Sequence, residues 1–428
     1  MENSNIIIAN AAQVVTCSGC KAKAGREMSD LHIIENGAVI IEKGRIKAAG
    51  RTKELLDGFD TQGFIVMDAS GKAVLPGFTD SHTHFIFAGY RAEEFSQRLR
   101  GDSYMRIMEQ GGGIMNTVRA TRNASAEELM LLGKKRLDTM LSFGVTTVEG
   151  KSGYGLDRET EIRQLEVMRT LDETHPIDIV PTFLGAHAIP PEYKGKEDDF
   201  IAWITEQVMP EIAERKLAEF CDIFCEKNVF SPDQSRKYLT RAKELGFRIT
   251  LHADEIAPMG GAELAAELGA LSADHLLRAS DHGIADMAAS GVVATLLPGT
   301  AFSLKEPYAR ARYMIDAGCA VALATDMNPG SCFTESLPLI FALAVLHMDM
   351  SIEESVTAFT INGAAALGRA DSAGSIDPGK KGDIVILEYP SYQFIPYHLG
   401  VNTVETVIKD GEIVFDKKGG SLCWPICL

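Results

Sequence analysis

The sequence has no apolar run long enough to cross a membrane. The longest candidate, LPLIFALAVLHM at 337–348, is about half of the ~20 apolar residues that a membrane-spanning helix needs, and we expect a buried helix there. The first residues, MENSNIIIAN, also lack the basic segment and apolar stretch of a secretory signal. These absences predict a cytoplasmic protein with no membrane partner.

Positive charge is in short supply. The chain has 42 Lys and Arg residues against 59 Asp and Glu residues, which gives a net charge of -17. A nucleic-acid partner requires a basic face. The charge balance therefore argues against nucleic acid as a partner.

Cysteine is sparse and scattered, with eight residues in the chain. Cys17 and Cys20 form a single CxxC motif, and no second CxxC pair accompanies it. One such pair is weak support for a zinc or redox site. We expect ordinary reduced thiols, in keeping with a cytoplasmic location.

Short β-rich runs fill both ends of the chain. Examples are GAVIIEKGRIKAAG near the start and TVETVIKDGEIVF near the end, each interrupted by Gly and Asp. Each run is too short to stand alone, and KDGEIVF echoes EKGRIKAAG. We predict that residues 1–75 and 369–428 pair into one small β-sandwich domain, with residues 76–368 inserted between them.

The middle of the chain alternates short apolar strands with long helical patterns, as repeated βα units do. Two of the expected helices lie at 125–144 and 159–171. The expected strands are LPGFTDSH, VTTVEG, DIVPTFLGA, CDIFCE, RITLHAD, SADHL, VVATLLP and AVALATD. Eight strands with helical crossovers predict an α/β fold, a (β/α)₈ barrel of the TIM type.

Five of the ten histidines lie where these strands end, which is where such barrels place their catalytic groups. They are His82, His84, His187, His252 and His275, and Asp326 ends the eighth strand in the same way.

The spacing of His82 and His84 allows both imidazoles to face one ion, because alternate residues of an extended strand point to the same side. Imidazole nitrogen and carboxylate oxygen suit zinc or iron, with a coordination position left for water. We predict one divalent metal per chain, Zn²⁺ or iron, bound by His82, His84, His252 and Asp326. A metal in such a site acidifies water and makes it nucleophilic.

A site of this kind also needs a group that moves protons. Glu255 follows His252 by three residues in HADE, just beyond a strand end, and is our candidate. Asp326 can orient the water while it binds the metal. His275 is expected to hold the water or to stabilise the oxyanion.

The order of PGFTDSHTH, HADE, SADH, ATD, TINGAAALG and GSIDPGKKGDIVIL resembles the amidohydrolase superfamily from end to end. Within it, RAEEF, GGGIMNTVRATR, KSGYGL, TFLGAHAIPPEY and TDMNPGS resemble the imidazolonepropionase family, over about residues 70–385. That family acts in histidine degradation and hydrolyses 4-imidazolone-5-propanoate to N-formimidoyl-L-glutamate. The resemblance implies the same hydrolysis of a cyclic amide here.

The resemblance also implies roles for particular residues. Arg91 and Tyr154 would hold the propanoate carboxylate, for which a guanidinium is a forked, permanently charged partner. His187 would contact the imidazolone ring, and Glu255 its nitrogens. Further ligand contacts would come from Asn328, Gly330 and Ser331. By analogy with the family, a homodimer is expected.

Three alternatives remain open at this point. A deaminase of cytosine or guanine would share the metal-binding residues, but a neutral base gives Arg91 and Tyr154 no evident use. A two-metal enzyme would need a carbamylated lysine after the fourth strand, where Lys227 is the candidate. A scaffold without catalysis would be expected to have lost its ligands, and every predicted ligand is present.

Overall fold

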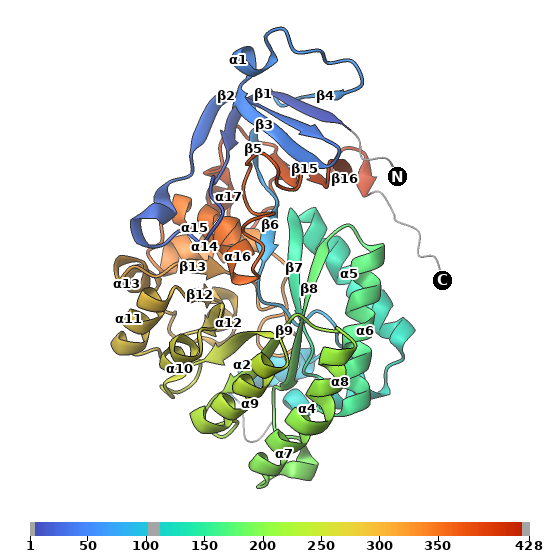
Figure 1. The fold of residues 1–428 in the computed structure, drawn as a ribbon, viewed down its shortest axis with the longest axis vertical. Helices are drawn as coiled ribbons and strands as arrows, with labels where there is room; N and C mark the ends of the chain where they lie inside the picture. The colour runs from blue at the N-terminus through green and yellow to red at the C-terminus, as the bar shows by residue number, and fades with distance from the viewer. Residues whose placement is uncertain (1–4, 102–111, 422–428) are drawn as a thin grey trace.

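Eight parallel strands from the middle of the chain form the larger part of the molecule, in a computed structural model that describes residues 5–101 and 112–421. They pair in chain order, each with the next, and Figure 1 shows the helices that surround them. All eight predicted strands are present, and their bounds are β6 Phe78–Asp80, β7 Val145–Lys151, β8 Asp178–Ala186, β9 Phe220–Cys225, β10 Arg248–Ala253, β11 Ser272–His275, β12 Val293–Leu296 and β13 Val321–Leu323.

The first and last of these strands meet beyond their carboxyl ends. Thr83 and Met327 form a parallel bridge. The backbone N–H of Asp326 donates to the His82 carbonyl at 3.0 Å, and that of His84 to the Met327 carbonyl at 2.9 Å. The sheet therefore closes into the predicted barrel at the end that carries the histidines.

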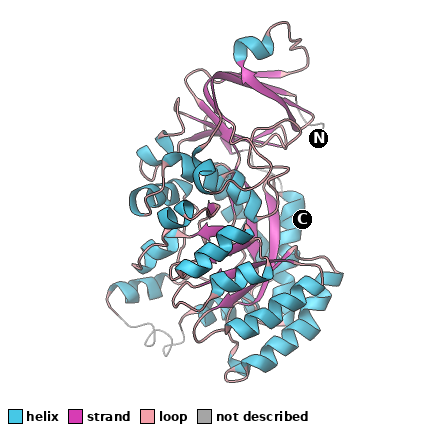
Figure 2. Cartoon of the chain, turned by 60° about the vertical axis from the view of Figure 1, so that its left-hand side comes forward, coloured by secondary structure: helices cyan, strands magenta, loops and turns pink. Residues whose placement is uncertain are grey.

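Helices surround the barrel and fill the connections between its strands (Figure 2). The predicted helices at 125–144 and 159–171 are α5 and α6, which begin after the capping side chains of Ser125 and Asp157. The apolar run at 337–348 forms the buried helix α14, and none of the described helices is long and apolar enough to span a membrane. The α-helices are α1 Thr52–Leu56, α2 Ala92–Leu99, α4 Ile114–Asn123, α5 Ala126–Ser142, α6 Arg158–Thr174, α7 Glu197–Trp203, α8 Met209–Glu214, α9 Pro232–Glu244, α10 Gly261–Leu268, α11 Asp281–Ser290, α12 Pro298–Leu304, α13 Ala311–Asp316, α14 Leu337–His347, α15 Ile352–Phe359, α16 Ile361–Ala366 and α17 Phe394–Tyr397.

Both ends of the chain combine into one mixed sheet of nine strands, as predicted. Strand β5, which leads into the barrel, pairs antiparallel with β14, which returns from it. Ile8, Val39, Ile384 and Ile408 from the two ends share one apolar cluster. The bounds are β1 Ile6–Val15, β2 Ile33–Glu42, β3 Arg45–Arg51, β4 Ile65–Asp68, β5 Ala73–Pro76, β14 Ile384–Leu387, β15 Val404–Lys409, β16 Glu412–Asp416 and β17 Gly420–Ser421. The domain boundaries at 75/76 and 368/369 stay a prediction.

The two sequence echoes form matching hairpin turns. Lys43 and Gly44 have φ of 52° and 75°, and Asp410 and Gly411 have φ of 48° and 77°. Two successive positive φ values define the turn that suits a tight hairpin and explain a glycine at each second position. A Cβ on Gly411 would lie 3.0 Å from Gly44 Cα, so the two turns meet and the sheet curls on itself.

Candidate active site

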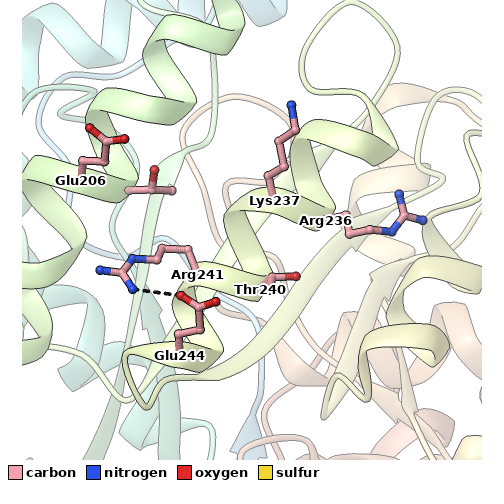
Figure 3. Close-up of a pocket in the computed structure, with 7 residues that line it drawn as sticks. Glu206, Arg236, Lys237, Thr240, Arg241 and Glu244 are labelled. Atoms are coloured by element: carbon pink, nitrogen blue, oxygen red, sulfur yellow. Dashed lines mark hydrogen bonds and ion pairs between the residues drawn. The ribbon is translucent and has the colours of Figure 1, made fainter.

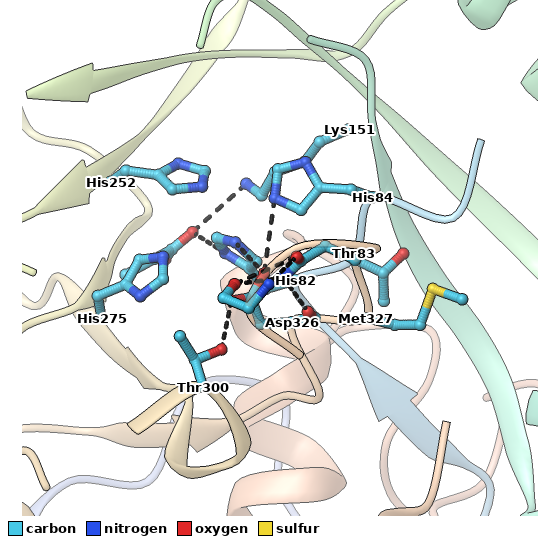
Figure 4. A network of polar contacts seen from close by, with 12 residues as sticks. His82, Thr83, His84, Lys151, His252, His275, Thr300, Asp326 and Met327 are labelled. Carbon is cyan, nitrogen blue, oxygen red and sulfur yellow. Dashed lines mark hydrogen bonds and ion pairs between the residues drawn. The ribbon is translucent and has the colours of Figure 1, made fainter. Parts of the chain in front are cut away.

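Closure of the barrel brings the first candidate ligands together. His82 Nε2 and His84 Nε2 each lie 3.6 Å from Asp326 Oδ1. The second oxygen of Asp326 accepts a hydrogen bond from Thr300 Oγ1 at 2.5 Å, which fixes the carboxylate plane. Asp326 itself has φ of 50°, a left-handed backbone that turns its side chain back over the strand ends. Figure 4 shows this convergence.

His252 and His275 complete the cluster from β10 and β11. The ring centroids of His82 and His252 are 4.5 Å apart, and those of His252 and His275 are 5.1 Å apart. Potential ligand atoms of His82, His252 and His275 lie within 4.8 Å of one another, as do those of His82, His84 and Asp326. All four predicted metal ligands therefore belong to overlapping groups that share His82.

The donor atoms fit a divalent ion. His82 Nε2 is buried and has no hydrogen-bond partner among the described residues, which is the state of a nitrogen that faces an ion. With ligand bonds of about 2.0–2.1 Å, tetrahedral donors lie about 3.4 Å apart, close to the 3.6 Å found between Asp326 and the two histidines. Burial lowers the pKa of His82 and His84 well below the ordinary value, which keeps both imidazoles neutral and able to bind metal.

A buried network of charged side chains, which the sequence analysis did not identify, lies directly behind the histidines. Asp274 Oδ2 is 2.7 Å from His82 Nδ1, and Asp222 Oδ2 is 2.7 Å from His252 Nδ1. The His82–Asp274 contact is a hydrogen bond, which fixes the tautomer of a metal-binding histidine and leaves Nε2 for the ion. Asp222 is the ion-pair partner of His252. The sequence does contain a signal for this network, because charged residues interrupt otherwise apolar strands, as in CDIFC and SADH.

Lys151 provides the positive charge of this network. Its Nζ lies 2.9 Å from Glu149 Oε1, 2.9 Å from Asp222 Oδ2 and 3.4 Å from Asp274 Oδ2. Burial opposes the charged form of Lys151, but the three carboxylates outweigh it and raise the pKa. Burial also raises the pKa of Glu149, to about 7, although Lys151 lowers it.

Glu255 lies at the edge of the histidine cluster. Its Oε2 is 3.7 Å from His275 Nε2, and 14% of its side chain is exposed. Burial, with repulsion from Asp326, raises the pKa of Glu255 to about 8. A carboxyl group with a pKa near neutrality suits a group that accepts and returns protons.

Tyr154 and His187 stand on the other side of His84. The His187 ring stacks on that of His84 with centroids 4.9 Å apart and an interplanar angle of 11°, and Tyr154 lies 5.3 Å from His187. Gly153 makes this approach possible, because it has φ of 107° and a Cβ there would lie 2.9 Å from the His187 ring. The Glu161 carboxylate accepts hydrogen bonds from the backbone N–H groups of Gly153, Gly155 and Leu156, which holds the loop in place.

Arg91, at the start of α2, is the third predicted substrate-binding residue on this side of the barrel mouth. Its Nε donates to Glu94 Oε2 at 2.8 Å, and a Cβ on Gly330 would lie 2.2 Å from its Nη1. Arg91 and the loop after Asp326 are thus in direct contact, and a side chain at position 330 would displace the guanidinium.

Asn328 organises that loop from within. Its Oδ1 accepts from the N–H groups of Gly330 and Ser331, both at 2.8 Å, and its Nδ2 donates to the Asp326 carbonyl at 2.7 Å. The side chain of Asn328 therefore shapes the loop, and its direct contact with a ligand stays a prediction.

Lys227, the candidate for a metal-bridging carbamate, is exposed beyond β9 and takes no part in the cluster. Cys17 and Cys20 are free thiols, as predicted, and burial raises the pKa of Cys17 to about 11.

A hollow of about 650 Å³ lies elsewhere, between α9 and the π-helical turn Ile204–Val208 (Figure 3). Among its charged side chains, Arg241 pairs with Glu244 and Arg236 with Glu267, both at 2.9 Å. It contains none of the predicted site residues.

A parallel barrel with histidines and an aspartate at its carboxyl-terminal end is the arrangement of a hydrolase of the amidohydrolase class. Residues 106–415 match the model of the amidohydrolase family. Solved structures of this fold include an adenosine deaminase from Xanthomonas campestris with bound zinc (TM-score 0.73, 17% identity, covering 99% of this chain and 95% of that one). An atrazine chlorohydrolase from Arthrobacter aurescens in complex with zinc is similar (TM-score 0.71, 16% identity, 98% and 97% covered).

Two sequence relatives are much nearer. An imidazolonepropionase from Clostridium tetani is 64% identical over 417 residues, which are 97% of this chain and 100% of that protein. An imidazolonepropionase from Parabacteroides distasonis is 60% identical over 413 residues, 96% of this chain and 99% of that protein. The chain belongs to the imidazolonepropionase family of amidohydrolases.

Proposed function

We propose that this chain hydrolyses the cyclic amide C–N bond of 4-imidazolone-5-propanoate to give N-formimidoyl-L-glutamate, the third step of L-histidine degradation. The observation that carries the proposal is the position of Arg91, Tyr154 and His187 beside the His82–His84–Asp326 cluster, in a chain 64% identical to an imidazolonepropionase. This arrangement provides both a place for an anionic substrate and a place for hydrolysis.

One divalent ion per chain, zinc or iron, would be held by His82, His84, His252 and Asp326. When bound, it would supply Lewis acidity and lower the pKa of a water molecule. Support comes from the partner-free His82 Nε2 and from the neutral state that burial gives to His82 and His84.

Glu255 moves the proton in this proposal. It takes a proton from the attacking water and returns it to the ring nitrogen that leaves, so that water is added across the C–N bond. Asp326 orients the water, and His275 stabilises the negative charge that develops on the carbonyl oxygen. The 3.7 Å separation of Glu255 and His275 allows both to act on one small ring.

Arg91 and Tyr154 bind the propanoate carboxylate, and His187 contacts the imidazolone ring. Asn328, Gly330 and Ser331 line the opposite side of the ligand. A substrate with a carboxylate explains the guanidinium better than a neutral base does, because a buried or half-buried anion requires a fixed cation. A cytoplasmic location and a homodimer complete the proposal.

The direct test is to incubate the purified protein with freshly made 4-imidazolone-5-propanoate. We expect loss of its ultraviolet absorbance and formation of N-formimidoyl-L-glutamate, identified by mass. Cytosine, guanine and adenosine serve as control substrates. Turnover of one of these bases without turnover of the imidazolone would contradict the proposal.

A further inference from the structure

Inside the barrel, three strands contribute a layer of charged side chains below the histidines. Lys151 ends β7, Asp222 lies on β9 and Asp274 lies on β11. These are alternate strands of the barrel, and alternate strands supply the side chains of one interior layer. All three side chains are fully buried, in a position where such barrels ordinarily carry branched apolar residues.

The same carboxylate oxygens serve the lysine and the histidines. Asp222 Oδ2 lies 2.9 Å from Lys151 Nζ and 2.7 Å from His252 Nδ1. Asp274 Oδ2 lies 3.4 Å from Lys151 Nζ and 2.7 Å from His82 Nδ1. One ammonium group therefore connects two carboxylate–imidazole pairs.

The other contacts of the two aspartates fix the direction of each carboxylate. Asp222 Oδ1 accepts the backbone N–H of His252 at 3.1 Å, and Asp274 Oδ1 accepts Ser272 Oγ at 2.8 Å. Glu149 Oε1, which accepts from Thr182 Oγ1, holds the third side of the ammonium. Without Lys151, three buried carboxylates would face one another, and a buried charge without a partner is strongly unfavourable.

We propose that Lys151 is a positioning residue for the metal centre: its ammonium keeps the Asp222 and Asp274 carboxylates on Nδ1 of His252 and His82, so that both imidazoles present Nε2 to the ion. The inference rests on the proposed function, because it assumes that these two histidines bind the metal. Lys151 acts only through the aspartates and touches neither the ion nor the substrate.

The test replaces Lys151 by methionine, which has a similar length and no charge. Affinity for Zn²⁺ is measured by competition with a chelating dye, and the cobalt-substituted protein is examined by its visible absorption. We expect the Kd for Zn²⁺ to rise by about 10–100-fold, the usual scale for loss of a group that orients a ligand. The cobalt bands should shift, and kcat should fall while KM changes little.

The chain offers a matched control. Lys409 is also buried among three carboxylates, those of Asp178, Asp383 and Asp410, at the opposite end of the barrel strands. Lys409→Met should lower stability and leave the Zn²⁺ affinity and the cobalt bands as in the wild type. Lys151→Arg, which keeps the charge, should recover part of the affinity that Lys151→Met loses.

A folded Lys151→Met protein with wild-type Zn²⁺ affinity and wild-type cobalt bands would overturn the inference. If that variant does not fold, Lys151→Gln is measured in its place with the same expected loss and the same overturning result. Metal affinity is measured without substrate. A wild-type protein that is inactive on the imidazolone would therefore contradict the proposed function without affecting this test.

Discussion

Two lysines of this chain are buried among three carboxylates each, one inside the barrel and one between the barrel and the small sheet. Lys151 contacts Glu149, Asp222 and Asp274. Lys409, on β15, contacts Asp178 at the start of β8, Asp383 just before β14 and the neighbouring Asp410. Each cluster has one buried ammonium group among three carboxylates, but Asp178 and Asp410 are partly exposed, whereas the three carboxylates around Lys151 are buried.

They differ in what the carboxylates contact next. Asp222 and Asp274 each continue to the Nδ1 atom of a histidine at the mouth of the barrel. Asp178 continues to Lys381, with which it forms an ion pair at 2.6 Å, and Asp383 to the backbone N–H of Asp410. The second cluster therefore fastens the small sheet to the floor of the barrel. A buried ion cluster alone does not mark a functional site, because its role depends on its outer contacts.

The largest effect is expected from a substitution that breaks the Lys409 cluster at the floor of the barrel. Lys409→Met should reduce the free energy of unfolding by about 3–5 kcal/mol, because the buried Asp383 carboxylate loses its ion-pair partner. Urea denaturation measures this. Along β8, Asp178 lies nine residues from His187, about 30 Å at about 3.3 Å per residue, so kcat and KM of the folded fraction should stay at wild-type values. A changed KM would contradict the separation of the two regions.

The next largest effect is expected from a substitution at the mouth of the barrel, and it concerns turnover alone. Glu255→Gln should lower turnover at least about a hundredfold, the scale of lost general acid–base assistance, while bound metal and the unfolding midpoint stay unchanged. Steady-state kinetics and metal analysis check both points. Wild-type turnover would remove Glu255 from the mechanism.

Arg91→Ala should weaken substrate binding through loss of a charge-assisted contact worth about 1.5–3 kcal/mol. We therefore expect KM to rise by about tenfold to a hundredfold with a smaller change in kcat. Removal of Arg91 also leaves Glu94 without its ion-pair partner at 2.8 Å, so Glu94→Gln combined with Arg91→Ala is the control for that loss. An unchanged KM would refute the carboxylate role.

The smallest expected effect is a loss of stability in acid that originates at the mouth of the barrel, at His187. Burial, helped by repulsion from His252, lowers the pKa of His187 from 6.5 to about 3. Between pH 6.5 and about 3, His187 is protonated in the unfolded chain and neutral in the folded chain. The free energy of unfolding therefore falls as the pH drops through this range.

At pH 5, the loss from His187 alone is about 2 kcal/mol, from 1.5 pH units at about 1.4 kcal/mol each. Urea unfolding at pH 7 and pH 5 should show a smaller decrease for His187→Gln than for the wild type. An equal decrease in both proteins would show that His187 is protonated in the folded chain.

Most of the fold was predictable because it depends on local patterns. Alternation of short apolar runs with helices located all eight barrel strands, and repeated hairpin signals at the two ends predicted that the ends pair. The histidines at strand ends were predictable for a related reason, since every parallel strand of a barrel ends on the same face.

The charged layer behind those histidines was not predictable in the same way. Alternation along β7 places Glu149 and Lys151 on one side of the strand, but it does not say which residues of β9 and β11 lie opposite. The family resemblance implied that Arg91 and Gly330 contact the same ligand, but their direct contact joins segments far apart in the sequence and required the structure.

The sequence by itself determined the barrel, the pairing of its two ends and the set of side chains at the barrel mouth, because periodicity and strand order are properties of the chain. Only the tertiary structure decided which carboxylate supports which histidine and that one lysine serves two of them. Those choices depend on the register and curvature of eight strands closed in a ring, where a few ångströms determine whether two charges touch.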